Sequence, residues 1–258
     1  MVVLEKITLR KIFLEIDGLT LLKNISFSVK SGEILVTYGP NGSGKSLINR
    51  VLGLLFRPQQ GSIFWNEEEI FRDSEFLKPP ENYRRRIGFV WQKPVFLTGN
   101  VARNVEMPLT MQGVPKEERK HKIDQLATEF GLKDLLYQNP RKLSGGEMQK
   151  VSFLRAVIHD PDFLILDEPT ASLDPTSILW FEEKILEKKA EGIPIVFTTH
   201  DLLQAKRIGD KIGIIIDSRL VEYGDIKSVL DHPKNDLARA YLHGDLKQVV
   251  SSEISDSK

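Results

Sequence analysis

The sequence predicts an α/β fold built on a mainly parallel sheet, with a helical segment inserted into it. Short apolar runs of strand length alternate with segments whose apolar residues recur at helical spacing. One such run, at 33–38, passes through a glycine-rich turn directly into a helical pattern that begins at Lys45. With 41% hydrophobic residues, a chain of 258 residues can bury a sizeable core, which excludes a disordered or fibrous protein.

The first part of the chain is expected to form mostly strands. Residues 25–29 alternate apolar and polar, as in a half-buried strand, and 33–38 are a more buried run. After the helix from Lys45, further strands are expected at 61–66 and 86–91.

Residues from about 95 to 160 have helical patterns instead. The clearest is 116–132, with Gly131 near its C-terminal end. Strand and helix patterns then alternate again, so the core of the sheet is expected to be parallel. The segments concerned are the strands 163–166, 194–197 and 211–216 and a helix around 178–189. Beyond about 231 the chain runs into a polar tail with too few apolar residues to fold alone.

Charge and composition exclude several classes of function. The 36 Lys and Arg residues balance 36 Asp and Glu residues, so no net field attracts nucleic acid or an anionic membrane. The chain has no cysteine, which excludes disulfides, thiol catalysis and Cys-bound metals and fits a reduced cytosolic location. No apolar run approaches the roughly 20 residues of a membrane helix, and the N-terminus lacks a secretory signal pattern. We expect an intracellular protein that can still dock to a membrane partner.

A phosphate-binding pattern, G-x-x-x-x-G-K-[ST], lies between the strand at 33–38 and the following helix. Its glycines let backbone N–H groups surround a phosphate, and the helix N-terminus adds a favourable dipole. Lys45 is expected to span the β- and γ-phosphates and Ser46 to bind Mg²⁺. A glycine-rich turn without a ligand is the alternative, but it gives the lysine and the hydroxyl no packing role. The candidate nucleotide-binding residues are Gly39, Pro40, Asn41, Gly42, Ser43, Gly44, Lys45 and Ser46.

Two carboxylates, Asp167 and Glu168, follow the apolar run at 163–166. A parallel strand would deliver them to the C-terminal edge of the sheet. There Asp167 is expected to hold Mg²⁺ through water, and Glu168 to polarise the attacking water as a general base. The alternative is a plain strand end at which the aspartate caps the next helix.

A second helix N-terminus is formed by Ser144, Gly145 and Gly146. Such an end suits a phosphate, yet one nucleotide already has its own loop. The three residues are therefore expected to bind the γ-phosphate held by another copy of the chain. The alternative is N-capping by Ser144, with Glu147 completing a capping box.

These motifs, and their order along the chain, resemble those of the nucleotide-binding subunits of ATP-binding cassette (ABC) transporters. The resemblance extends over nearly all of residues 3–245. The motifs that carry the resemblance are, in chain order, the phosphate loop, Gln92, the signature Leu143-Ser144-Gly145-Gly146, Asp167-Glu168, the loop Ala171-Ser172-Leu173-Asp174, and His200.

The resemblance implies an ABC ATPase fold: a P-loop NTPase core with a mixed, mainly parallel sheet, an antiparallel β subdomain and an inserted helical subdomain. Residues 1–94 and 161–230 then form the ATP-binding core with the β subdomain, and 95–160 form the helical subdomain with the signature. Residues 231–258 form a C-terminal helix and a polar tail.

The resemblance also implies roles for further residues. Gln92 is expected to bind Mg²⁺, to sense the water and to link the core to the helical subdomain. His200 is the switch that contacts the γ-phosphate, and Asp174 acts across a dimer interface. Two departures from the family pattern stand out. Glu147 replaces a common Gln, and no residue stands out as the aromatic that usually stacks on adenine. Phe13 is the nearest aromatic candidate, whereas alignment on residues 21–26 places Ile16 at that position.

For function, the resemblance implies two copies that sandwich two ATP molecules, hydrolyse them and drive a membrane permease from the cytoplasmic face of the cell membrane. The permease is expected to dock near Gln92, where Pro94, Val95, Phe96 and Leu97 are either exposed or core. A solute-binding protein is a candidate further partner; nucleic acid is not expected.

The segment 91–97, with Asn104-Val105 downstream, resembles importers of oxyanions such as tungstate, molybdate or phosphate. Alternatives are amino-acid importers and exporter or lipoprotein-release ATPases. A soluble ABC-type ATPase of DNA repair, chromosome architecture or translation is a different class. The stretch between Lys45 and Ser144 is too short for a long coiled coil, and the chain holds one cassette. A nucleotide kinase would leave the signature and His200 unexplained.

Overall fold

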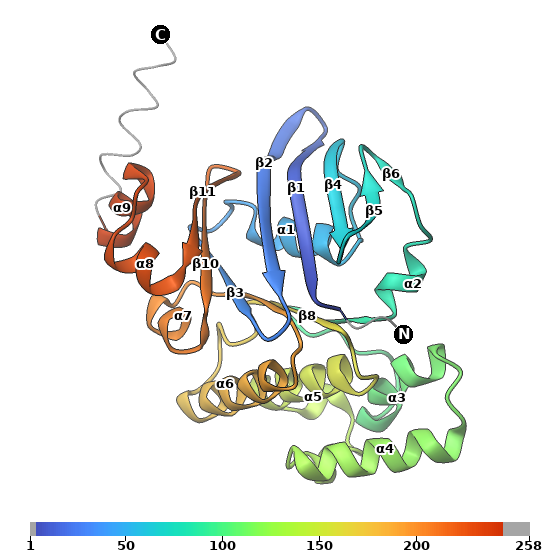
Figure 1. Cartoon of the computed structure of the whole chain (residues 1–258). Helices are drawn as coiled ribbons and strands as arrows, with labels where there is room; N and C mark the ends of the chain where they lie inside the picture. Colours follow the sequence, from blue (N-terminus) through green and yellow to red (C-terminus); the bar gives the residue numbers. More distant parts are fainter. Residues whose placement is uncertain (1–3, 245–258) are drawn as a thin grey trace.

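The computed structural model describes residues 4–244, and in them a single mixed sheet runs through the molecule (Figure 1). Its strand order is β6-β5-β4-β1-β2-β11-β10-β3-β9-β8-β7. The last part of this order is parallel. It consists of β10 (Lys211–Ile216), β3 (Ile34–Tyr38), β9 (Ile195–Thr198), β8 (Phe163–Asp167) and β7 (Ile87–Val90). The expected α/β fold with a mainly parallel core is confirmed.

The parallel strands are buried on both faces, and alternate residues enter two different cores. In β8, Leu164 and Leu166 pack with the helices on one side. Phe163 and Ile165 pack on the other side, with the helix that follows β3 and with the antiparallel strands. A strand covered on both faces needs apolar residues at every position, which explains its continuous apolar run.

The antiparallel strands form the other part of the sheet. They are β1 (Lys6–Ile16), β2 (Leu19–Lys30), β4 (Gln60–Trp65), β5 (Glu68–Arg72) and β6 (Glu75–Phe76), with β11 (Arg219–Asp225) bridging to β10. The sequence pattern predicted only the second half of β2 and most of β4. The register of β1 shifts between Leu9 and Ile12, where Lys11 has a φ of 50°. Such a bulge interrupts the apolar-polar alternation by which a strand is recognised.

Two groups of helices cover the sheet. Helix α1 (Lys45–Leu52) contacts β2, β8 and β9. On the opposite side lie α3 (Val101–Met111), α4 (Lys116–Glu129), α5 (Gly145–Val157) and α6 (Pro175–Ala190) (Figure 1). The shorter helices are α2 (Glu81–Arg84), α7 (Leu202–Ile208), α8 (Ile226–Asp231) and α9 (Asp236–His243), with 3-10 turns at Lys133–Leu135 and Pro140–Lys142.

The second helix of the inserted segment, α4, ends earlier than the expected 132. Its last residue is Glu129, and Gly131 follows with a φ of 68°. A glycine in this left-handed conformation ends a helix because the chain turns away there without steric cost. Helix α9 lies in the C-terminal region, whereas the polar residues from 245 on lie outside the described residues. Between residues 4 and 244, no helix combines the length and the apolar character needed to cross a bilayer.

Strand β7 packs directly on α5, and Gly88 makes this approach possible. A Cβ at this position would lie 2.3 Å from the carbonyl oxygen of Ala156 and 2.5 Å from Cδ2 of Leu164. Gly88→Ala is therefore expected to lower the free energy of unfolding by about 1–3 kcal/mol through overpacking, as measured by urea denaturation. Gly145→Ala is the control, because nothing lies within 4 Å of its added Cβ. Equal midpoints for both variants and the wild type would contradict the tight packing.

Candidate functional site

The candidate site lies at the C-terminal edge of the parallel strands, where several loops converge. Strand β3 leads into the phosphate-loop motif (residues 39–46), β8 ends at Asp167, and β9 is followed by His200. The loops surround a cavity of about 770 Å³. Its lining residues are Gly39, Pro40, Asn41, Gly42, Gly44, Lys45, Ser46, Leu47, Gln92, Glu168, Ala171, Ser172, His200 and Tyr241.

The phosphate-loop motif needs its glycines for two reasons. Gly42 and Gly44 have φ values of 82° and 106°, which side chains other than glycine rarely adopt. A Cβ on Gly39 would lie 2.0 Å from the carbonyl oxygen of Ile215, and one on Gly44 would lie 2.8 Å from Cδ2 of Leu22. The loop is thus pressed against its neighbours, and Ser43 brings a buried hydroxyl that has no hydrogen-bond partner among residues 4–244.

The Lys45 side chain folds back over the loop. Its Nζ donates to the carbonyl oxygens of Gly39 and Pro40, each at 2.8 Å, and lies 3.9 Å from Oε1 of Glu168. Burial lowers the pKa of Lys45, while the nearby carboxylates of Glu168 and Asp167 oppose this shift. A buried ammonium group held by two carbonyl oxygens, with a carboxylate at 3.9 Å, is well placed to donate hydrogen bonds to the oxygens of a phosphate.

Asp167 lies behind Ser46 in a buried polar network. Its Oδ1 accepts hydrogen bonds from Ser46 Oγ and Asn49 Nδ2, both at 3.0 Å. Asn49 also donates to Thr198 Oγ1 at 2.7 Å, which itself lies 2.8 Å from Thr37 Oγ1. Burial raises the pKa of Asp167, and the two hydrogen bonds to its carboxylate counteract this. A hydroxyl and a carboxylate side by side are the oxygen donors that Mg²⁺ prefers, so these residues fit that metal.

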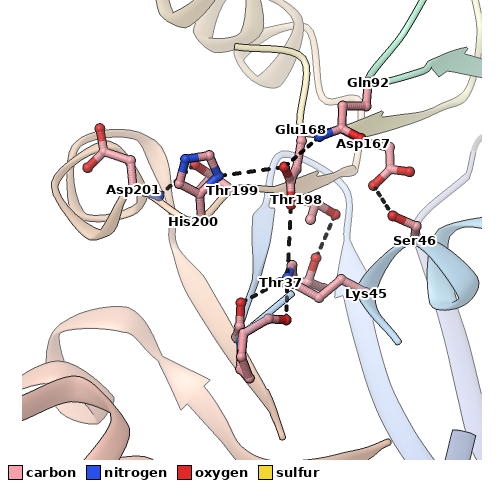
Figure 2. A network of polar contacts seen from close by, with 12 residues as sticks. Thr37, Lys45, Ser46, Gln92, Asp167, Glu168, Thr198, Thr199, His200 and Asp201 are labelled. Atoms are coloured by element: carbon pink, nitrogen blue, oxygen red, sulfur yellow. Dashed lines mark hydrogen bonds and ion pairs between the residues drawn. The ribbon is translucent and has the colours of Figure 1, made fainter. Parts of the chain in front are cut away.

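Glu168 lies at the centre of the site and is contacted from three sides (Figure 2). Gln92 Nε2 donates to its Oε2 at 3.0 Å, and His200 Nδ1 lies 3.6 Å from the same oxygen. Lys45 faces the other carboxylate oxygen. Only 12% of the Glu168 side chain is exposed, and its backbone has a φ of 46°, a conformation that non-glycine residues adopt mainly at turns and functional sites.

The signature residues lie elsewhere. Ser144 caps α5, and its Oγ and N both donate to Glu147 Oε2, at 2.7 and 2.8 Å, in the capping box considered above. Gly146 packs so closely on α6 that an added Cβ would lie 2.8 Å from Ser177 Oγ. Ser177 is held by Asp174, the N-cap of α6. None of Ser144, Gly145, Gly146, Glu147 and Asp174 is among the described residues that line the cavity.

Two residues at or beside the site, Gln149 and Tyr241, were not identified as functional candidates from the sequence. Gln149 of α5 donates to the carbonyl oxygens of Trp91 and Gln92, at 3.1 and 2.7 Å, and so ties the signature helix to the Gln92 segment. Tyr241 of α9 reaches the cavity from far along the chain and packs on Tyr38, with ring centroids 5.3 Å apart. Gln149 follows the signature by a few residues, but nothing in the pattern of α9 distinguishes Tyr241.

Neither candidate for adenine stacking lines the cavity. Phe13 is half-buried and pairs with Gln60 in the sheet, and Ile16, which is 37% exposed, ends β1 opposite Leu19. An aromatic side chain that does line this cavity is that of Tyr241.

The profile of one protein family, described as ABC transporter, matches residues 22–171, more than half of the chain. The chain belongs to the ABC transporter family. Its similarity to curated proteins extends further along the chain. A phosphate import ATP-binding protein, PstB 2, of Natronomonas pharaonis is 35% identical over 239 residues, which are 89% of this chain and 84% of that protein.

Two further relatives are also named as import subunits. The molybdate/tungstate import ATP-binding protein WtpC of Methanocaldococcus jannaschii is 36% identical over 86% of this chain and 71% of its own length. The methionine import ATP-binding protein MetN of Corynebacterium diphtheriae is 34% identical over 89% of this chain and 68% of its own length.

Solved structures agree with the fold. An ATP-binding subunit of an ABC transporter superposes with a TM-score of 0.79 at 26% identity, over 93% of this chain and 99% of that one. CbiO1 of Clostridium perfringens, part of the CbiONQ transporter complex, superposes with a TM-score of 0.78 at 26% identity, over 93% and 95% of the two chains. This ABC transporter subunit is an ATP-binding, transport-coupled ATPase.

Proposed function

We propose that two copies of this ABC transporter subunit hydrolyse Mg²⁺-ATP between them and thereby drive the import of a small solute through a membrane permease. The observation that supports this most is the division of the site. The phosphate-loop motif, Glu168 and His200 line the cavity, whereas the signature at Ser144 lies outside it at the N-terminal end of α5. A phosphate-binding end outside the pocket is explained if it completes the pocket of a second copy.

The nucleotide is bound by the phosphate-loop motif. Its backbone N–H groups and the unpartnered Ser43 hydroxyl surround the phosphates, and Lys45 exchanges its two carbonyl acceptors for phosphate oxygens. Ser46, Asp167 and Gln92 are the residues that would hold Mg²⁺. When bound there, the ion neutralises charge on the phosphate oxygens.

Glu168 is the general base in this proposal. Its carboxylate accepts the proton of the attacking water, and Gln92 and His200 hold one of its oxygens in place. His200 contacts the γ-phosphate from the same edge of the sheet. Asp174, beside Gly146 and Ser177, acts across the interface between the two copies.

The capping box gives Ser144 a partner while the copies are apart. Its hydroxyl donates to Glu147 in the single chain, so binding a γ-phosphate in the other copy requires the hydroxyl to turn away from that carboxylate. Loss of the γ-phosphate on hydrolysis then removes this contact and lets the two copies separate. We propose that residues 1–94 and 161–230 form the ATP-binding core with the β subdomain, 95–160 the helical subdomain, and 231–258 a C-terminal helix and polar tail.

The permease docks in a groove between the core and the helical segment. This groove has a volume of about 450 Å³, and three of its apolar residues are largely exposed: Val95 by 68%, Leu97 by 57% and Met111 by 67%. Arg155 of α5 donates to the carbonyl oxygen of Val95 at 2.7 Å. Because α5 also carries the signature, movement of the signature reaches the docking segment directly.

Charge placed in this groove should separate the subunit from its permease. Val95→Glu combined with Leu97→Glu is expected to abolish co-purification with the permease, because burying two carboxylates in an apolar contact is unfavourable. ATP turnover of the isolated subunit should stay within about twofold of the wild type, since neither side chain lines the ATP cavity. Tyr137→Glu is the control, an 80% exposed residue of the helical segment outside the groove. Normal co-purification of the double variant would refute this docking surface.

An oxyanion such as phosphate, molybdate or tungstate is the proposed cargo. The sequence around the groove supports this, and so do the names of two relatives. The subunit then lies on the cytoplasmic face of the cell membrane as a homodimer, with a solute-binding protein as a further partner of the permease. We propose no nucleic-acid partner.

The proposal is tested by purification from native membranes in mild detergent, followed by mass spectrometry of what accompanies the subunit. A polytopic permease together with a solute-binding protein for an oxyanion is the expected result. An exporter-type permease without a solute-binding protein would overturn import. Recovery only with ribosomal or DNA-associated proteins would overturn the role in transport altogether.

A further inference from the structure

A buried amide side chain joins the two loops that carry Glu168 and His200. Gln204 of α7 is 2% exposed, and its Oε1 accepts hydrogen bonds from Thr170 Oγ1 and Thr199 Oγ1, both at 3.0 Å. Thr170 lies two residues after Glu168, and Thr199 directly precedes His200. The two threonines are 7% and 4% exposed, so water does not compete for these contacts.

The orientation of the Gln204 amide is set from its other end. Its Nε2 donates at 3.1 Å to Oε1 of Glu182, a residue of α6 that is 6% exposed. Glu182 is paired with Arg207, whose Nη2 and Nε donate to its two oxygens at 2.6 and 3.0 Å. A rotated amide would direct its oxygen at the Glu182 carboxylate, so only one orientation satisfies both ends.

We propose that Gln204 is a positioning residue for ATP hydrolysis, which holds the Glu168 loop and the His200 loop in register. This inference rests on the proposed roles of Glu168 and His200. The two loops follow different strands, β8 and β9, and their reactive groups lie 3.6 Å apart. Apart from the strand pairing itself, the shared acceptor on Gln204 is a direct link between them, made by residues that do not line the cavity.

The first test is Gln204→Leu, which keeps the approximate volume but removes the acceptor. Turnover of ATP should fall about ten- to hundred-fold, because small displacements of reacting groups have effects of that size. The KM for ATP should change less than about twofold, since the phosphate-loop motif and Lys45 are untouched. Tyr223→Phe is the matched control, because it removes a hydrogen bond to the carbonyl oxygen of Ser28 in the sheet, and neither residue lines the cavity. It should leave turnover unchanged.

The second test uses pH and separates positioning from general loss of structure. In Gln204→Glu the new carboxyl group faces Glu182, with Arg207 and Asp201 nearby. At low pH it is protonated, donates to Glu182 as the amide did, and keeps its carbonyl oxygen for the threonines. As pH rises it ionises beside a second carboxylate, so turnover relative to the wild type should decline. Wild-type turnover of both variants at every pH would overturn the inference.

The two threonines provide a third arm. If Gln204 acts through them, Gln204→Leu should have little further effect on turnover in a chain that already carries Thr170→Val and Thr199→Val. Additive losses would overturn the inference. A failure of the proposed function is distinct from either result, because it would appear as wild-type turnover in a Glu168 variant while Gln204 is intact.

Discussion

Glu168→Gln is expected to keep ATP binding while losing turnover by about 10²- to 10⁴-fold, the usual contribution of a general base. The amide has the shape of the carboxylate and can still contact Gln92, but it cannot take a proton from water. Removing the charge also relieves repulsion between this residue and the γ-phosphate, so ATP should be retained. The closed dimer should then accumulate, visible as an ATP-dependent doubling of mass in size-exclusion chromatography with light scattering.

Glu191→Gln provides the control for this prediction. Glu191 follows α6 on the surface and pairs with Lys188, so turnover and dimerisation should match the wild type. If Glu168→Gln hydrolyses ATP at the wild-type rate, Glu168 is not the base. If turnover is lost but no dimer forms with ATP, the proposed closure between two copies is wrong.

Lys45→Ala is expected to lose nucleotide binding itself, with the Kd for ATP rising by roughly a hundred-fold or more. The wild-type Lys45 side chain is 5% exposed, and carbonyl oxygens of the loop hold its ammonium group in place. Without it, Glu168 and Asp167 would face the phosphates without a compensating side-chain cation from the loop. Isothermal titration with ATP at fixed Mg²⁺ measures the effect.

Thermal unfolding distinguishes this loss from misfolding. ATP should raise the Tm of the wild type but not of Lys45→Ala, because a ligand stabilises only what it binds. Without ATP, the variant should still unfold cooperatively. Lys93→Ala is the control, since Lys93 is an exposed neighbour of Gln92 that does not line the cavity. An unchanged affinity of Lys45→Ala for ATP would refute the phosphate contact.

The parallel strands and the long helices could be predicted because their signals are local. A strand buried on both faces, such as β8, is a continuous apolar run, and a covered helix repeats its apolar residues every three or four positions. The antiparallel strands were harder to predict from the sequence. In β1 a bulge at Lys11 breaks the alternation of apolar and polar residues. Every residue of β11 is at least partly exposed, so neither strand has a clear apolar-polar alternation.

The site residues also divide into those with a local signal in the sequence and those without one. The phosphate-loop motif, Asp167 and Glu168 were predicted because each needs only a strand, a turn and a few side chains that are adjacent in the sequence. That Gln92 and His200 contact the same oxygen of Glu168 is visible only in the fold. Asn49, Gln149 and Gln204 gave no signal, since an amide in a helix is ordinarily a surface residue.

The sequence alone determined which chemical groups this ABC transporter subunit carries, and in which order. Those properties reside in short stretches whose conformation depends on neighbours along the chain. The tertiary structure decided which of these groups meet. The ends of β3, β8 and β9 share one edge of the sheet, so a lysine, two carboxylates and a histidine from distant segments gather there. The signature lies on α5 outside the cavity, because α5 packs against β7 and α3 rather than against the phosphate-loop motif.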